Sequence, residues 1–174
     1  IFYGLVDEEL NVPEQQRIFP EPGNEQYIWE LIQRFGKLDM CWGGVGITGH
    51  IAFNEPPESG ESCTDAEFLE RPTRILRIAR ETKTINAYMN AGADLDAIPD
   101  YCITVGMKEI NFAQKIRMLM PRDWNAAILR KALHGPITCH VPVSLFQNHP
   151  DAKIYALALA ATTPVVPEIR VYNK

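Results

Sequence analysis

The stretch LDMCWGGVGITGHIAFNEP, residues 38–56, carries the strongest structural signal in this sequence. It opens with a mostly apolar run that ends in glycines, which is typical of a short buried strand leading into a loop. Glycine accepts positive φ angles and lets the backbone approach a ligand closely. We therefore expect a strand near residues 38–43, followed by a loop that is a candidate site.

Helical and strand patterns alternate on both sides of this stretch. Asn24 can cap a helix that continues to Phe35, and residues 1–10 resemble the end of an amphipathic helix. Residues 57–73 are polar and turn-rich, which predicts a surface excursion. The remaining patterns predict strands near 75–79, 101–105, 116–120 and 153–159, and helices near 81–92, 108–114, 122–135 and 142–149.

Near-continuous apolar strands that alternate with helices favour an α/β fold. In detail, we expect a doubly wound, mostly parallel, Rossmann-like sheet with helices on both faces. The length of 174 residues favours a single domain, 1–174. Because ligands of such folds bind beyond the carboxyl ends of the strands, the loop after residue 43 is the first place to look for a site.

Composition limits which binding partners and which cellular compartment are expected for this chain. The formal net charge is −5, which disfavours nucleic acid and anionic membrane because phosphate binding needs clustered Lys and Arg. The sequence has no apolar run of about 18 residues and no secretory signal at its start, so we expect no membrane partner.

The four cysteines are far apart and are expected to be buried free thiols, which fits a reducing cytoplasm. The chain begins with Ile in mid-pattern, so we expect an N-terminal part to precede it.

The glycine-rich loop fits neither of the common phosphate-binding fingerprints. GGVGITG only approximates the dinucleotide-binding motif G-x-G-x-x-G, and two prolines soon after it interrupt the helix that this motif requires. The Walker phosphate loop is also excluded, because the sequence Gly-Lys-Ser/Thr is absent. His50 is then the informative residue, with Glu55 five positions later. A histidine held by a carboxylate is the usual arrangement for acid–base catalysis, whereas a loop histidine bonded to a backbone carbonyl is the structural alternative. A metal site would need a second His or Cys near His50, and the sequence places none there.

GGVGITGHIAFNEP closely resembles the signature G-G-(I/V)-G-x-D-G-H-I-A-F-N-E-P of the glucosamine-6-phosphate deaminase (isomerase) family. The related 6-phosphogluconolactonases share the G-H portion of this signature but lack IAFNEP. Further segments resemble the deaminase family in the same order: TRILRIARETKTINA, PDYCITVGMKEINFAQKIRMLM and ILRKALHGPITCHVPVSLFQNHPDAKIYA. The chain is identified as a divergent member of this family that lacks the N-terminal part.

The resemblance implies a hydrolase and aldose–ketose isomerase that converts glucosamine 6-phosphate to fructose 6-phosphate and ammonia. This reaction belongs to amino-sugar metabolism and N-acetylglucosamine catabolism in the cytoplasm, and it requires no metal and no organic cofactor. The partner would be a small sugar phosphate, and a homo-oligomer is a further expectation. The family's proton-moving Asp and its phosphate loop would lie before residue 1, so we expect the 174-residue chain alone to be inactive.

Site residues follow from the resemblance position by position. His50 matches the residue that opens the sugar ring, and Glu55 matches its carboxylate partner, with Thr48 at the third catalytic position. The implied substrate-binding residues are Gly44, Gly46, Gly49, Asn54 and Lys83, of which Gly44 and Gly46 would shape the loop against the sugar.

Several positions depart from the family pattern. Thr48 replaces the family's Asp near the histidine, and a hydroxyl cannot stabilise imidazolium by charge. Tyr88 stands where the family has a phosphate-binding Arg, with Lys83 as the nearest cation, and Arg170 is the nearest candidate for a second phosphate cation. These departures leave two alternatives open: a non-catalytic sugar-phosphate-binding paralogue, or an isomerase for another sugar phosphate.

Overall fold

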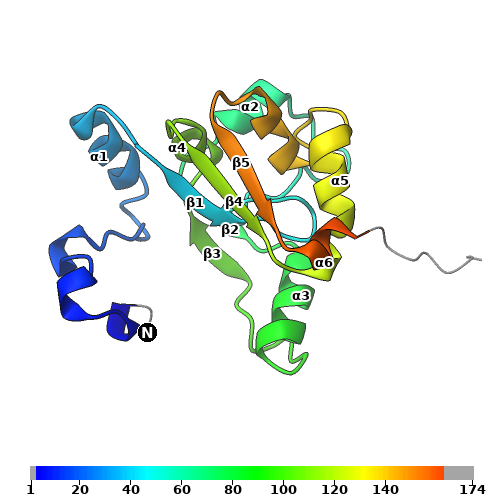
Figure 1. The fold of residues 1–174 in the computed structure, drawn as a ribbon, viewed down its shortest axis with the longest axis horizontal. Helices are drawn as coiled ribbons and strands as arrows, with labels where there is room; N and C mark the ends of the chain where they lie inside the picture. Colours follow the sequence, from blue (N-terminus) through cyan, green and yellow to red (C-terminus); the bar gives the residue numbers. More distant parts are fainter. Residues whose placement is uncertain (1–2, 163–174) are drawn as a thin grey trace, which may run out of the picture.

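The computed structural model describes residues 3–162 (Figure 1). Its α-helices are α1 (Tyr27–Phe35), α2 (Asp65–Leu69), α3 (Arg80–Asn90), α4 (Met107–Asn111), α5 (Ala126–His134) and α6 (Ala158–Ala161). Its strands are β1 (Cys41–Gly44), β2 (Arg74–Arg77), β3 (Tyr101–Thr104), β4 (Ile116–Met120) and β5 (Ala152–Ala156). Short 3-10 helices occupy Tyr3–Leu5, Glu8–Leu10, Glu14–Gln16, Asp123–Asn125 and Pro142–Asn148.

None of the described helices is long and apolar enough to span a membrane. Arg170 lies outside the described residues.

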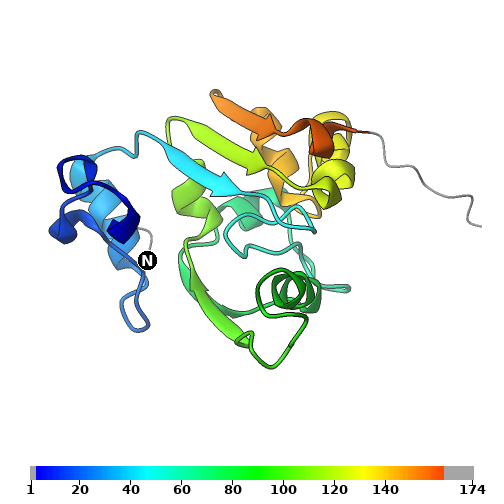
Figure 2. The ribbon, with the colours of Figure 1, turned by 60° about the horizontal axis from the view of Figure 1, so that its bottom comes forward.

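Three strands form a parallel sheet in the order β1–β4–β5, with β4 in the centre (Figure 2). Gly43 lies beside Met118, and Met118 lies beside Ile154. Because the strands run in one direction, their carboxyl ends meet at one edge. The α/β class with a mostly parallel sheet is therefore confirmed. The loop after β1 leaves from the edge where ligands bind in such folds.

One face of this sheet carries the hydrophobic core. Met118 of β4 is 1% exposed, and Ile116 and Met120 on the same face are also fully buried. They join one buried cluster with apolar side chains of α2, α4, α5 and Pro142–Asn148. Cys139 belongs to this cluster. All four cysteines are free thiols, as the sequence predicts, but only Cys139 is buried, and the other three are partly exposed.

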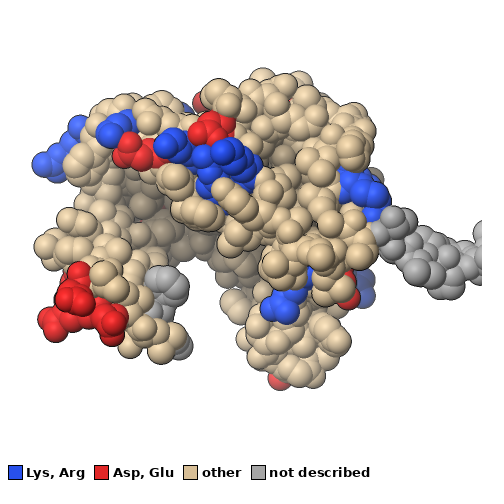
Figure 3. Space-filling model, in the orientation of Figure 1, with Lys and Arg blue, Asp and Glu red and all other residues tan. Residues whose placement is uncertain are grey.

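Most of the opposite face of the same strands is open to solvent, although Arg117 of β4 is buried there. Trp42, Leu119 and Tyr155 are 60%, 43% and 48% exposed, and the rings of Trp42 and Tyr155 stack 6.0 Å apart. On the side of the molecule drawn in Figure 3, Lys and Arg side chains gather in the upper middle and the surface below them is mostly uncharged. The exposed side chains of Trp42, Leu119 and Tyr155 show that, within residues 3–162, helices cover one face of this sheet. The sequence predicts helices on both faces.

The β2 and β3 strands do not join the parallel sheet. They pair with each other in antiparallel fashion, with Ile75 beside Ile103, as a separate two-stranded ribbon. The prediction that residues 75–79 and 101–105 continue the parallel sheet is wrong. Exposure alternates along β2, which is the pattern of an antiparallel strand with one solvated face rather than of a fully buried parallel strand.

Two local predictions also need correction. Residues 3–10 form short 3-10 turns with Leu5 and Leu10 exposed, instead of the end of an amphipathic helix. Residues 57–73 are not a surface excursion throughout, because they contain α2, whose Phe68 is fully buried. The side chains of the N-cap Thr64 and of the third helical residue form a capping box, which starts this helix in a polar segment.

Helix α1 ends as predicted but begins later. Gly36 follows Phe35 with a left-handed φ of 71°, which stops the helix. Gln26 occupies the N-cap without a side-chain hydrogen bond, so Asn24 does not cap this helix.

Candidate active site

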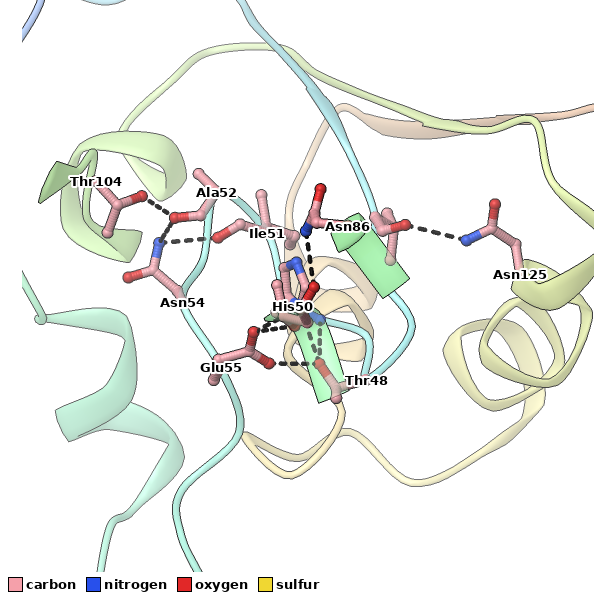
Figure 4. Close-up of polar contacts among 11 residues, drawn as sticks. Thr48, His50, Ile51, Ala52, Asn54, Glu55, Asn86, Thr104 and Asn125 are labelled. Atoms are coloured by element: carbon pink, nitrogen blue, oxygen red, sulfur yellow. Dashed lines mark hydrogen bonds and ion pairs between the residues drawn. The ribbon is translucent and has the colours of Figure 1, made fainter. Parts of the chain in front are cut away.

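The residues after β1 form a compact loop that turns back on itself (Figure 4). Val45 and Ile51 form an isolated antiparallel bridge, and the Gly46 N–H donates to the His50 carbonyl over 2.9 Å. Ala52 then takes a positive φ of 48°, which turns the chain again. This loop places His50 just beyond the carboxyl end of β1.

Asn54 fastens the loop to Val105, the residue after β3. Figure 4 shows its bonds to Ile51 and Ala52 within the loop. Asn54 is 0% exposed, and its amide nitrogen donates to the carbonyl oxygens of Ile51 and Val105, at 2.9 Å each. The Arg74 guanidinium donates to its amide oxygen over 2.7 Å. Asn54 therefore holds the loop in place, and its contact with substrate stays a prediction.

His50 and Glu55 lie in contact within this loop (Figure 4). The distance from His50 Nδ1 to Glu55 Oε1 is 3.0 Å, and both side chains are largely buried. Thr48 joins them, because its hydroxyl donates to Glu55 Oε2 over 2.7 Å and its oxygen lies 2.9 Å from His50 Nδ1. The structure thus brings together the three residues that the sequence singles out for catalysis, with Nδ1 directed toward the carboxylate.

The environment of Glu55 favours its ionised form. Burial works to raise the pKa of Glu55, because a buried charge loses its water. The hydrogen bond and the charge interaction with His50 work in the opposite direction, followed by the hydroxyls of Thr82 and Thr48. The net result is a pKa of Glu55 below its ordinary value. An ionised Glu55 can stabilise the imidazolium that forms when an acid–base histidine takes up a proton.

The glycines of the loop differ in how much the structure needs them. A Cβ atom at Gly46 would lie 1.9 Å from His50 Cε1 and 2.1 Å from its Nε2, so only glycine leaves room for the imidazole. Gly49 has a φ of 89°, in the left-handed region that favours glycine. At Gly44 an added Cβ would meet nothing within 4 Å. Contacts of all three glycines with substrate stay predictions.

Lys83, the cation that the resemblance implies for the substrate, already has a carboxylate partner. The ammonium group of Lys83 lies 2.6 Å from Asp100. Lys83 lines a cavity of about 450 Å³ together with Arg77 and Arg80, and the lining of this cavity includes neither His50 nor Glu55. Among residues 3–162, no group of three or more His, Cys, Asp or Glu side chains is arranged to hold a metal ion. The role of Lys83 in substrate binding stays a prediction.

Sequence reasoning misses two polar residues that complete the site. Thr82, in the first turn of α3, donates a hydrogen bond from its hydroxyl to Glu55. Asn125 donates from its side-chain amide to the Val45 carbonyl over 3.0 Å and so holds the start of the loop. Both come from far along the chain, so no local spacing points to them. Thr82 does lie in the segment TRILRIARETKTINA, which carries part of the resemblance.

No protein-family model matches the chain, but curated proteins and a solved structure are similar to it. The glucosamine-6-phosphate deaminase of Lachnoclostridium phytofermentans is 34% identical over 124 residues, which are 71% of this chain and 48% of that protein. The glucosamine-6-phosphate deaminase of Cronobacter sakazakii is 34% identical over 125 residues, which are 72% of this chain and 43% of that protein. The chain therefore spans about half the length of the curated relatives it matches.

A solved structure of a protein with the same name is also similar to this chain. It is a monomeric glucosamine-6-phosphate deaminase described as a missing link of the NagB superfamily, and it matches with a TM-score of 0.68 and 27% identity, over 80% of this chain and 53% of that one. The fold and the site thus define a class of α/β proteins with a buried His–Glu pair on the loop after a parallel strand. With the sequence matches, the particular family follows: the chain belongs to the glucosamine-6-phosphate deaminase family.

Proposed function

We propose that the protein is an aldose–ketose isomerase and deaminase that converts glucosamine 6-phosphate to fructose 6-phosphate and ammonia. The observation that carries this proposal is the buried contact of 3.0 Å between His50 and Glu55, in a loop that resembles the family signature at every position except Thr48. The curated relatives are named for this activity. The reaction needs an acid–base group at the ring oxygen, then a proton transfer between two carbons, and then the loss of ammonia.

His50 is the proposed acid–base group for ring opening. Its Nδ1 is engaged by Glu55 and Thr48, so Nε2 is the nitrogen left to exchange a proton with the ring oxygen. Glu55 would orient the imidazole and balance its positive charge. Thr48 has no charge to contribute, but its hydroxyl fixes the second oxygen of the Glu55 carboxylate.

Ammonia release from glucosamine 6-phosphate tests the proposal, measured in a coupled assay on the protein expressed from its complete reading frame. His50→Gln is expected to abolish turnover because ring opening loses its proton carrier. Glu55→Gln should lower the rate by about 10²-fold or more, because the imidazolium loses its counter-charge. The matched control is His134→Gln at the exposed end of α5, which should keep the wild-type rate. Turnover that survives His50→Gln would contradict the assigned role.

The Thr48 departure favours one alternative, a non-catalytic protein that binds a sugar phosphate. Thr48→Asp separates the two readings, because in a weakened enzyme a second carboxylate near His50 Nδ1 should raise the rate by stabilising the imidazolium. If neither wild type nor Thr48→Asp releases ammonia at millimolar substrate while calorimetry detects binding, the protein is a sugar-phosphate binder. Turnover of a different sugar phosphate would identify an isomerase with another substrate.

A cytoplasmic location and a homo-oligomeric state belong to the same proposal and rest on the resemblance alone. Light scattering of the purified protein tests the oligomeric state, and cell fractionation tests the location. A monomer mass would leave the proposed activity untouched, because the solved relative is itself described as monomeric.

A further inference from the structure

Helix α3 reaches the His50–Glu55 pair through one side chain, Thr82. Thr82 is 1% exposed. Its hydroxyl donates a hydrogen bond to Glu55 Oε1, and its oxygen lies 3.3 Å from His50 Nδ1. These contacts connect the loop after β1 to a separate helix, so they restrain the carboxylate from outside the loop.

The hydrogen bonds around Glu55 determine which nitrogen of His50 carries a proton. The Thr48 hydroxyl donates to Oε2 and the Thr82 hydroxyl donates to Oε1, so each hydroxyl has used its single hydrogen. An ionised carboxylate can only accept. His50 Nδ1 therefore faces three acceptors: Thr48 Oγ1 at 2.9 Å, Glu55 Oε1 at 3.0 Å and Thr82 Oγ1 at 3.3 Å. In this environment a neutral imidazole holds its hydrogen on Nδ1 and keeps its lone pair on Nε2.

We propose that Thr82 is a positioning residue that, through Glu55, fixes this tautomer of His50. The proposal rests on the proposed acid–base role of His50, because a proton-transfer histidine needs its lone pair on the nitrogen that faces the substrate. Thr48 belongs to the same loop as the pair, whereas Thr82 belongs to α3. The Glu55 carboxylate also lies beside the first turn of this helix, where the helix dipole favours a negative charge.

A role for Thr82 in packing alone makes a different prediction. Valine has nearly the same shape as threonine and fills the same space, but it cannot donate to Glu55. Serine keeps the hydroxyl and loses only the methyl group. Thr84 provides a matched control, because it is exposed on the same helix and its hydroxyl donates to the Arg80 carbonyl over 2.8 Å.

Long-range proton–nitrogen NMR spectra of the 174-residue chain report the tautomer of His50 and need no turnover. At a pH where this imidazole is neutral, wild type, Thr82→Ser and Thr84→Val should show one tautomer with the proton on Nδ1. In Thr82→Val the nitrogen shifts should move toward those of a mixture of tautomers. Unchanged shifts in Thr82→Val would overturn the proposal. A wild-type proton on Nε2 would also overturn it, and this measurement decides even if Thr82→Val does not fold.

Kinetics on the protein from its complete reading frame provide a second readout. Thr82→Val should lower kcat roughly tenfold or more with little change in KM, and Thr82→Ser should restore it. This loss is smaller than the ~10⁴-fold loss when a Ser–His–Asp triad is forced into the wrong tautomer, because Glu55 and Thr48 remain. If no variant and no wild type releases ammonia, the proposed function fails, while the NMR result still decides the role of Thr82.

Discussion

The two faces of the β1–β4–β5 sheet differ sharply, although the same strands supply both. Met118 and Leu119 are neighbours on β4, yet Met118 lies in the core and Leu119 lies on the solvent-exposed face. The buried face also supports the candidate site. A Cβ atom at Gly43 would come within 3.2 Å of Met118 and 3.8 Å of Ile51, the residue that follows His50.

This difference shows that the geometry of the site depends on one layer of packing. Ile51 is buried in the same cluster as Met118, so the loop that carries His50 rests directly on the core. A change in that cluster should disturb the contact between His50 and Glu55. A change on the open face should leave the contact intact, and the following experiments test this distinction.

The largest effect is expected at the point where the loop backbone meets the imidazole. Gly46→Ala would place a methyl group on the His50 ring, which must then move. Misplacement of a catalytic group by about 1 Å can cost ~10²-fold in rate. We expect ammonia release by Gly46→Ala to fall at least that far.

Gly44→Ala is the matched control for this substitution. It adds the same methyl group two residues earlier, at a position where an added Cβ has no neighbour within 4 Å. Any loss of rate should be smaller than in Gly46→Ala, because Gly44, which the resemblance places against the sugar, does not adjoin the imidazole. Equal losses in Gly44→Ala and Gly46→Ala would show that loop flexibility, and not room for the imidazole, explains the effect.

The neighbours Met118 and Leu119 give the most direct test of the two faces. Met118→Ala leaves a cavity in the core and should lower the free energy of unfolding by about 2–5 kcal/mol. Leu119→Ala removes a side chain from the exposed face and should stay within about 0.5 kcal/mol of wild type. Urea denaturation followed by circular dichroism measures both values. Similar losses in the two variants would show that the open face is covered in solution.

The sequence alone predicts the local parts of this structure well. An apolar run followed by glycines indicated a strand at 38–43, and β1 occupies Cys41–Gly44. The contact between His50 and Glu55 lies within one loop, so their spacing and the family signature were enough to suggest it. The capping-box pattern from Thr64 to Glu67 was also present in the sequence and could have revealed α2.

The parts that sequence reasoning missed depend on contacts between distant segments. The β2 and β3 strands looked like further members of the parallel sheet, because an apolar run does not specify its partner strand. Thr82 reaches Glu55 across 27 residues and Asn125 reaches Val45 across 80. No periodicity or motif spacing encodes such pairs, which appear only once the chain is folded.

A smaller effect is expected from the polar anchor of the loop. Asn54→Ala would remove the donor to the Ile51 and Val105 carbonyls and the acceptor for Arg74. Buried groups left without partners cost about 1–3 kcal/mol, which is the expected loss in the free energy of unfolding. Asn90→Ala, at an exposed position near the end of α3, is the control and should change little. A neutral result for Asn54→Ala would mean that packing alone holds the loop on the core.

The smallest expected effect concerns the charge of Glu55. Its pKa in the folded chain lies below the ordinary value of 4.5, so the ionised carboxylate stabilises the folded state. This contribution is complete above the carboxyl pKa of the unfolded chain and is lost as the pH falls through the lowered folded value. Urea midpoints measured from about pH 7 down to about pH 3 should therefore fall less steeply in Glu55→Gln, whose amide does not titrate. Met118→Ala should instead lower the midpoint by a similar amount at every pH, because the cavity it creates carries no charge. Identical pH slopes in wild type and Glu55→Gln would show that the buried pair adds packing to the covered face but no charge-dependent stability.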